Sequence, residues 1–127
     1  MFSDNLGLLA AAVSPADVSS TIMPIFRGLC GDYEPEIRAS AVYHMADLLA
    51  VCFDTSAKKD ILMTGTRLLS DVHNYVRMSL AGAVLKSVKY VPKELWGTTI
   101  VPTCTSLLAD KEPDVRLALI SGFSSMT

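Results

Sequence analysis

Two kinds of charged side chain recur at a fixed interval along this chain of 127 residues. The aspartates Asp32, Asp71 and Asp110 repeat every 39 residues, and each is followed six residues later by an arginine. The arginines are Arg38, Arg77 and Arg116. An array of acids and bases is one interpretation of this pattern. We favour a structural ladder, because a guanidinium and a carboxylate form paired hydrogen bonds that suit a repeated clamp between stacked turns.

The other residue types that carry chemistry do not form a site. His44 and His73 have no metal-ligand spacing with each other or with a cysteine, and no C-x-x-C pair is present. The three cysteines, which are Cys30, Cys52 and Cys104, lie in apolar runs typical of buried, reduced thiols. The sequence lacks G-x-S-x-G, H-E-x-x-H and P-loop patterns. We therefore predict no catalytic residue, no metal, no cofactor and no enzymatic activity.

The composition limits the classes of protein further. Half of the residues are hydrophobic and 19% are charged, which excludes intrinsic disorder. A net charge of -2 and a pI near 5.6 give no electrostatic footprint for nucleic acid or anionic lipid. The apolar run over residues 6–13 is far shorter than the ~20 residues that span a bilayer, and no lysine or arginine precedes Arg27. These features predict a soluble cytoplasmic protein, with the nucleus as an alternative.

The apolar residues keep the same 39-residue register and indicate two helices in each unit. In the first unit, Ile22, Ile25, Phe26 and Leu29 have the spacing of one buried helical face. The second helix carries a continuous apolar stripe at Ile37, Ala41, Met45, Leu48 and Cys52. The columns shared by all units include Ile22, Ile61 and Ile100; Ile37, Val76 and Val115; Ala41, Leu80 and Leu119; and Met45, Val84 and Phe123. We expect these columns to form the core.

Proline and acidic residues mark where the second helices begin. Pro35 and Pro113 occupy the position of a first helical residue, where a missing N–H costs no hydrogen bond. Asn74 replaces proline at that position in the middle unit, and Met63 replaces the first-helix proline found at Pro24 and Pro102. We expect these replacements to change the local kinking of the middle unit. No alternation typical of a strand is present.

The repeat predicts the organisation of the whole chain. We expect one array over residues 1–127, in which 1–13 is the end of a truncated repeat and 14–52, 53–91 and 92–127 are repeats, the last slightly shortened. The fold class is all-α, with about seven antiparallel helices stacked in a right-handed superhelix. Both ends of the array are apolar, so we expect a piece of a longer array that self-associates through its exposed ends.

The unit as a whole resembles a known type of helical repeat. The stretch over residues 22–32, followed by 35–41, and the stretch over 101–121 combine a first-helix proline, an aspartate at the turn and an arginine early in the second helix. This pattern resembles HEAT repeats, and among them the scaffold (A) subunits of protein phosphatase 2A. The resemblance implies an α-α superhelix (HEAT-repeat solenoid) in which the Asp and Arg columns form an inter-repeat ladder. It also implies a noncatalytic scaffold that joins a phosphatase catalytic subunit to a regulatory subunit.

The turns between the paired helices hold the candidate partner contacts. Tyrosine is enriched where binding energy concentrates in protein interfaces, and exposed turns are accessible to a partner. The candidates are Tyr33, Glu34, Val72, His73, Asn74, Tyr75, Lys111 and Glu112. The alternative functions are another HEAT adaptor, in transport or translation, and a helical-repeat enzyme acting on nucleic acid. The near-neutral charge argues against the nucleic-acid enzyme, and we predict protein partners with no nucleic acid and no membrane.

Overall fold

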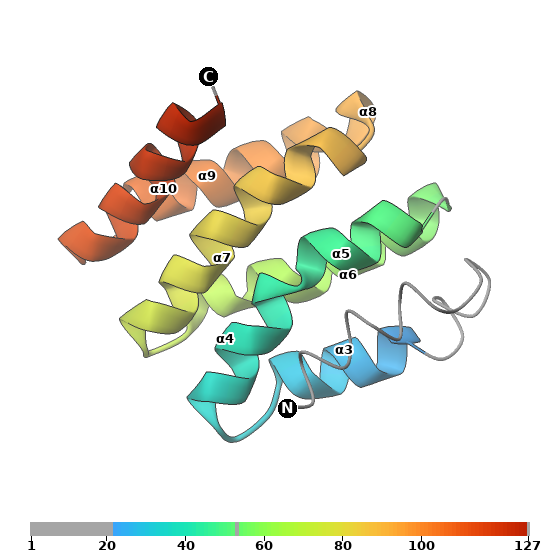
Figure 1. The fold of residues 1–127 in the computed structure, drawn as a ribbon, viewed down its shortest axis with the longest axis horizontal. Helices are drawn as coiled ribbons and strands as arrows, with labels where there is room; N and C mark the ends of the chain where they lie inside the picture. Colours follow the sequence, from blue (N-terminus) through green and yellow to red (C-terminus); the bar gives the residue numbers. More distant parts are fainter. Residues whose placement is uncertain (1–21, 53, 127) are drawn as a thin grey trace.

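The computed structural model describes residues 22–52 and 54–126, with side chains as far as residue 123, and this part consists of three stacked helix pairs (Figure 1). In the first pair, α3 (Met23–Cys30) packs with a second helix that is divided into α4 (Pro35–Tyr43) and α5 (Met45–Val51). In the second pair, α6 (Thr55–Thr66) ends in the 3₁₀ turn Arg67–Ser70, and α7 (Asn74–Ser87) ends in the 3₁₀ turn Val88–Tyr90. In the third pair, α8 (Lys93–Leu95), the π turn Trp96–Ile100 and α9 (Val101–Leu108) form the first helix, and α10 (Pro113–Met126) forms the second. No strand occurs in these ranges, so the all-α fold class is confirmed. The helix expected over residues 1–13 lies outside the described residues, and the repeat boundaries stay a prediction.

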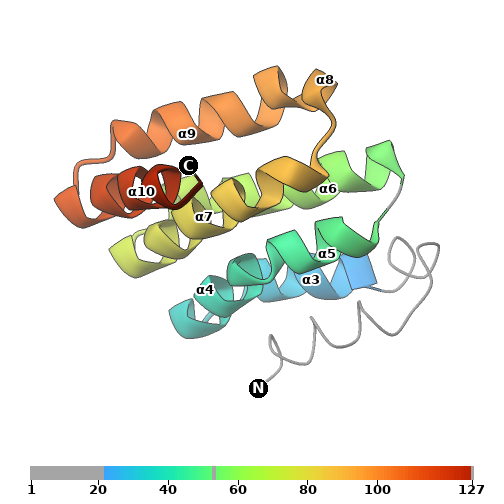
Figure 2. The same ribbon diagram turned by 45° about the horizontal axis from the view of Figure 1, so that its top comes forward.

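The helix pairs stack one upon the next, as Figure 2 shows from the α3–α5 pair to the α8–α10 pair. Helix α7 contacts α4 and α5 on one side and α10 on the other, so the second helices of the pairs form a continuous layer. The turns inside the pairs lie along one edge, which we call the turn ridge (residues 31–34, 71–73 and 109–112). The links from α5 to α6 and from α7 to α8 lie along the opposite edge, which we call the connection edge (Figure 1).

The core is built largely from the predicted columns. Ile22, Ile61 and Ile100 are buried, and the second-helix column of Ala41, Leu80 and Leu119 is fully buried. Val76 and Val115 are also fully buried, whereas Ile37 is only partly buried. Two expectations are wrong. Ile25 is 42% exposed because α3 buries Met23, Phe26 and Cys30, so its buried face is rotated by one residue from the predicted face. Phe123 is 43% exposed although it shares a column with the buried Met45 and Val84.

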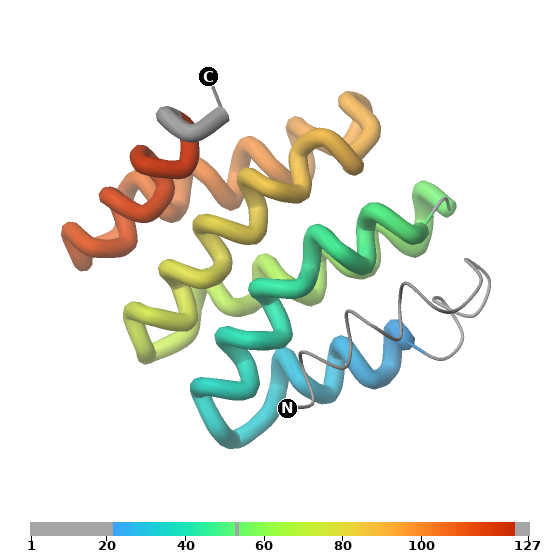
Figure 3. The backbone as a smooth tube through the Cα atoms, in the orientation of Figure 1, coloured from blue at the N-terminus to red at the C-terminus, as the bar shows by residue number. Residues whose placement is uncertain are grey.

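The second helix predicted for the first pair is broken into α4 and α5, although its predicted apolar residues Ala41, Met45, Leu48 and Cys52 are buried. At His44 the backbone has φ -89° and ψ 6°, and its N–H donates to the carbonyl of Ala41, three residues back, at 3.2 Å. The chain changes direction there, between α4 and α5 (Figure 3). Beyond the break, Met45 packs against Gly65 of α6, where its Sδ lies 2.5 Å from the place of an added β-carbon. The absence of a side chain at Gly65 therefore lets α5 approach α6 closely.

The proline columns explain a difference between the first helices. A π turn, Trp96–Ile100, precedes Pro102, and Ile22, two residues before Pro24, is also in a π conformation. Proline has no N–H to donate, so the backbone ladder loses a bond near it and the helix widens locally. Helix α6 carries Met63 in this column and is α-helical throughout. The middle unit thus differs from the third in its first helix, while the expected change in kinking stays a prediction.

Helix α10 generates a prediction about self-association. Leu117, Ile120 and Phe123 are exposed large apolar side chains on this one helix. Exposed apolar patches tend to find a covering surface, so we expect the isolated chain to form dimers or larger species at micromolar concentration. The substitution Ile120→Glu would shift it towards monomer in sedimentation velocity. A wild-type chain that sediments as a monomer throughout this range would contradict the prediction.

Candidate functional site

Each turn of the ridge is shaped by its aspartate. The carboxylate Oδ1 of Asp32 accepts a hydrogen bond from the N–H of Glu34 at 2.9 Å. Asp71 and Asp110 make the same bond to the N–H groups two residues on, at 3.0 and 2.9 Å. An aspartate that bonds its own backbone in this way closes a tight turn. The second helix then begins three residues after the aspartate, with Pro35, Asn74 or Pro113 as its first residue.

The arginines connect consecutive turns. Nε of Arg38 donates to Oδ2 of Asp71 at 2.6 Å, and Nη2 donates to Oδ1 at 3.2 Å. Arg77 forms the same two bonds to Asp110, at 2.7 and 3.2 Å. The remaining nitrogen, Nη1, bonds a backbone carbonyl within the arginine's own helix pair. Nη1 of Arg38 donates to the carbonyl of Asp32 at 2.7 Å, and Nη1 of Arg77 donates to the carbonyl of Asp71 at 2.6 Å. Each of these two guanidinium groups therefore ties together two turns.

Arg116 makes the backward bond of the other arginines, from Nη1 to the carbonyl of Asp110 at 2.5 Å. No carboxylate among the residues that the structure describes pairs with it. Arg116 therefore provides an internal comparison, because it has the local contact of Arg77 and lacks the contact with a following turn.

The paired carboxylates are held in the charged form. Burial alone would raise the pKa of Asp71, but the hydrogen bonds from Arg38 and from the N–H of His73 outweigh it and hold that pKa below its usual value. The same balance, with Arg77 and the N–H of Glu112, lowers the pKa of Asp110. The bond to Asp71 also raises the pKa of Arg38. Carboxylates that stay ionised and paired are poorly suited to general acid–base work near neutral pH, which favours a structural role.

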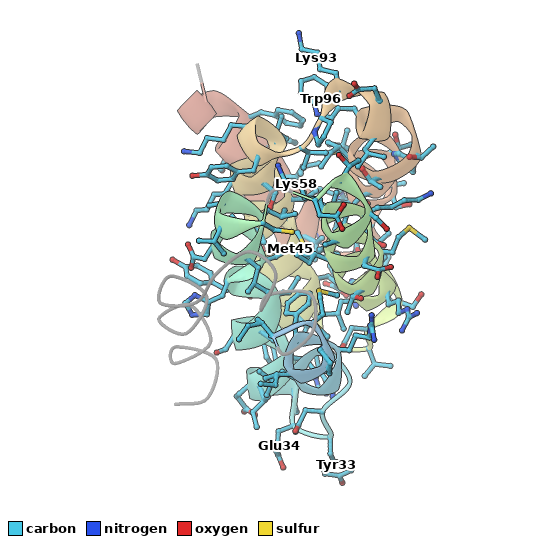
Figure 4. All side chains as sticks on the ribbon, turned by 90° about the vertical axis from the view of Figure 1, so that its right-hand side faces the viewer. Tyr33, Glu34, Met45, Lys58, Lys93 and Trp96 are labelled. Carbon is cyan, nitrogen blue, oxygen red and sulfur yellow. The ribbon has the colours of Figure 1, made fainter. Side chains whose placement is uncertain are left out.

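Three candidate contacts occupy one position in consecutive turns, directly after the aspartate. Tyr33 is 91% exposed, Val72 is 84% exposed, and Lys111 is also exposed. Figure 4 shows Tyr33 and the exposed Glu34 projecting away from the helices. The ridge thus presents an aromatic, an aliphatic and a cationic side chain in sequence. A partner that spans several turns would meet all three.

The remaining candidates lie closer to the helices. The rings of His73 and Tyr75 are 5.4 Å apart between centroids, and both side chains are exposed. Partial desolvation raises the pKa of Tyr75, and the nearby charge of Glu36, on α4, raises it further. The structure therefore brings Tyr75 near the first turn, although it belongs to the second. Asn74 and Glu112 are half-buried at the starts of their helices.

A hollow of about 370 Å³ lies between the second and third turns of the ridge. Its lining includes the ladder pair Arg77 and Asp110 and the candidates Val72 and Lys111, together with Leu69 and Ser70, which sequence reasoning missed. A column of small residues at Gly31, Ser70 and Ala109 was the available signal, because small side chains at a turn leave room beside it. The hollow is the part of the ridge most suited to holding a side chain of a partner.

Other chemistry receives no support from the described residues. They contain no cluster of three or more histidine, cysteine or acidic side chains placed to hold a metal. Burial raises the pKa of the Cys30 thiol to about 12, and it also raises those of Cys52 and Cys104. Such thiols are weak nucleophiles, because the thiolate is the reactive form. No helix in this described part of the chain has the length and apolarity required to cross a membrane.

The ladder predicts unequal effects of two arginine substitutions. Arg77→Ala removes the bonds that join the second and third turns, whereas Arg116→Ala removes only a bond within one turn. Hydrogen bonds to charged groups contribute about 1.5–3 kcal/mol, so we expect a loss of that order for Arg77→Ala and a smaller loss for Arg116→Ala. Urea denaturation monitored by circular dichroism measures both. Equal losses would show that the contact between turns adds nothing to stability.

The lowered carboxylate pKa values predict a pH dependence. Because the pKa values of Asp71 and Asp110 lie below the ordinary 3.8 in the folded chain, their stabilisation is complete above that value and is lost as the pH falls through the folded pKa values. We expect the difference in unfolding free energy between the wild type and Asp71→Asn to shrink as the pH falls from about 5 to 2. Asp32→Asn is the matched control, since the Asp32 carboxylate bonds the backbone in the same way but pairs with no arginine among the described residues. A pH-independent difference for Asp71→Asn would contradict this account.

Two comparisons with known proteins agree with this geometry. The HEAT repeat family matches residues 100–127, which cover most of the third helix pair. The beta isoform of the human 65 kDa regulatory subunit of serine/threonine-protein phosphatase 2A is 30% identical over 117 residues. That similarity covers 89% of this chain and 20% of the human protein, so the chain spans about a fifth of the length of this curated relative.

The family match and the internal register support each other. The matched unit is the third of three helix pairs whose aspartates and arginines recur every 39 residues, and the similarity to the human protein extends over most of the chain. The chain is therefore an array of helical repeats whose third unit matches the HEAT repeat family, and it resembles the 65 kDa regulatory subunit of serine/threonine-protein phosphatase 2A.

Proposed function

We propose that this chain is a noncatalytic scaffold segment whose turn ridge binds protein partners. The observation that supports it most is the combination of a buried ladder with exposed turn tips. Arg38 and Arg77 fix the positions of consecutive turns, and the residue after each aspartate points into solvent. A rigid row of accessible side chains loses little conformational entropy on binding, which favours affinity.

The resemblance suggests which partners the ridge binds. The human relative is named as a regulatory subunit of a serine/threonine-protein phosphatase. By analogy, this chain has two partners, which are the catalytic subunit of a phosphatase and a second regulatory subunit, and the complex forms in the cytoplasm. The scaffold would act by geometry: holding two proteins on one array raises their effective concentration towards each other.

The chemistry of the ridge indicates how a partner would be anchored. Tyr33 offers a large apolar surface with a hydroxyl, which is typical of residues that dominate interface energies. The hollow beside Val72 can receive a small apolar side chain, and Lys111 at its border can pair with a carboxylate. His73 and Tyr75 extend the same surface towards the start of α7.

Another HEAT adaptor, in transport or translation, is the alternative function. A helical-repeat enzyme acting on nucleic acid would need a basic surface and a reactive acid. The net charge of -2 and the ion-paired state of Asp71 and Asp110 both favour a scaffold over such an enzyme.

Binding to a purified phosphatase 2A-type catalytic subunit tests this function. We expect saturable binding in biolayer interferometry, and an affinity at least about tenfold weaker for Tyr33→Ala combined with Val72→Ser, because exposed anchors at an interface carry most of its energy. Met63→Ser is the matched control, since Met63 is also exposed but lies on α6, away from the ridge. A capture experiment from cytosol, analysed by mass spectrometry, distinguishes the alternatives. Recovery of transport or translation factors without the catalytic subunit would refute the phosphatase assignment.

A further inference from the structure

A second hollow lies in the layer of second helices, away from the turn ridge. Its volume is about 800 Å³. It is lined by α5, α7 with its 3₁₀ turn, Trp96 and α10. Its lining includes Asp47, Gly82, Leu85, Lys86, Lys89 and Trp96. We call it the second-helix groove. From Val72 to Lys89 the chain advances by about 25 Å at the rise of a helix, so the groove and the ridge lie towards opposite ends of α7.

Glycine opens the floor of the groove. A β-carbon added to Gly82 would meet no atom within 4 Å, so this position of α7 faces open space. In the 39-residue register the same position of α4 holds Tyr43, a large exposed side chain. Gly122 of α10 serves a different purpose, because a β-carbon there would collide with Cδ1 of Leu85. One glycine thus leaves the groove empty, while the other lets α10 pack against its wall.

The rim of the groove is cationic. Nζ of Lys86 lies 4.5 Å from the centre of the Tyr43 ring, and Nζ of Lys89 lies 5.2 Å from that of Tyr90. Neither ammonium pairs with a carboxylate within the described ranges 22–52 and 54–123. Asp47 is the single acidic residue of the described lining, and its Oδ2 lies 3.0 Å from Nδ1 of His44. Two cations therefore face the groove without an anionic partner in those ranges.

The end of the groove nearest the connection edge is fixed in place. Nε1 of Trp96 donates to the carbonyl of Val91 at 2.9 Å, so the indole ring has a defined orientation. Nζ of Lys58 donates to the carbonyl of Tyr90 at 2.8 Å and holds the 3₁₀ turn that carries Lys89. Figure 4 shows Trp96, with Lys93 close by, at the opposite end of the molecule from Tyr33. Preorganised aromatic walls reduce the entropy cost of binding a ligand.

We propose that the second-helix groove docks an acidic peptide segment of a partner protein, with one apolar side chain inserted over Gly82. The volume lies in the range of about 300–1,000 Å³ typical of sites that enclose a ligand. Leu85 forms the apolar wall for the inserted side chain, and carboxylates on either side of it pair with Lys86 and Lys89. This contact is separate from the turn ridge and would allow a partner to bind while the ridge is occupied.

Selection from a displayed library of random short peptides tests the proposal. We expect the selected peptides to be rich in aspartate and glutamate around an aromatic or aliphatic residue. A labelled, selected peptide would then be titrated by fluorescence anisotropy. Gly82→Leu, which fills the groove, and Lys86→Glu combined with Lys89→Glu are each expected to weaken binding at least about tenfold, because they remove the space and the charges used.

Matched controls keep the result interpretable. Gly28→Leu makes the same substitution in α3, at a helical position that also faces open space, and Lys59→Glu reverses an exposed charge on α6. Both should bind the peptide like the wild type. Both leucine variants should keep or raise the unfolding midpoint, since leucine favours helix more than glycine does. Selected peptides without acidic residues, equal binding by Gly82→Leu, or displacement by single-stranded RNA in place of acidic competitor peptides would overturn the proposal.

The ridge variants separate this proposal from the scaffold function. Tyr33→Ala with Val72→Ser is expected to leave peptide binding unchanged, because these residues are not part of the groove. Conversely, Gly82→Leu is expected to leave binding of the phosphatase catalytic subunit unchanged. Loss of both activities in either variant would contradict a separate groove site.

Discussion

A guanidinium that touches two turns at once sets the geometry of this array. The apolar columns supply cohesion, but burial of apolar surface is non-directional and tolerates a sliding of one helix pair against the next. The paired bonds from Arg77 to Asp110 do not tolerate such sliding, because the guanidinium and the carboxylate must face each other in one plane. The backward bond to the carbonyl of Asp71 then fixes the guanidinium itself. The exposed row on the turn ridge depends on this restraint.

The partly buried position of these ion pairs has a cost that their environment offsets. The side chains of Arg77 and Asp110 are almost fully shielded from water, and such burial penalises both charges. Further hydrogen bonds reduce the penalty, since the N–H of Glu112 also bonds Asp110. The pairs therefore contribute mainly to specificity of register, while Leu80, Leu119 and the other buried side chains contribute most of the cohesion.

Much of the fold was predictable because the 39-residue period reports the same environment three times. A residue such as Ile61 lies at a position that Ile22 and Ile100 also occupy, and all three are buried. Features found in one copy alone were not predictable in this way. The break at His44 accompanies the contact between Met45 and Gly65, and the second-helix groove depends on the absence of a side chain at Gly82. A glycine within a helix does not reveal in the sequence whether a neighbour or open space lies beside it.

The backward bond of each arginine also bears on how such chains can change in length. The guanidinium of Arg38 donates to the carbonyls of Asp32 and Tyr33, which belong to its own helix pair. These bonds orient the guanidinium whether or not a further pair is present. Each pair thus offers an acceptor to the pair before it and a prepared donor to the pair after it. Duplication of one whole unit would add a matching donor and acceptor together, whereas an insertion within the six residues from aspartate to arginine would disturb the backward bond. A ladder of this kind can therefore lengthen by whole units, which in this chain measure 39 residues from one aspartate to the next.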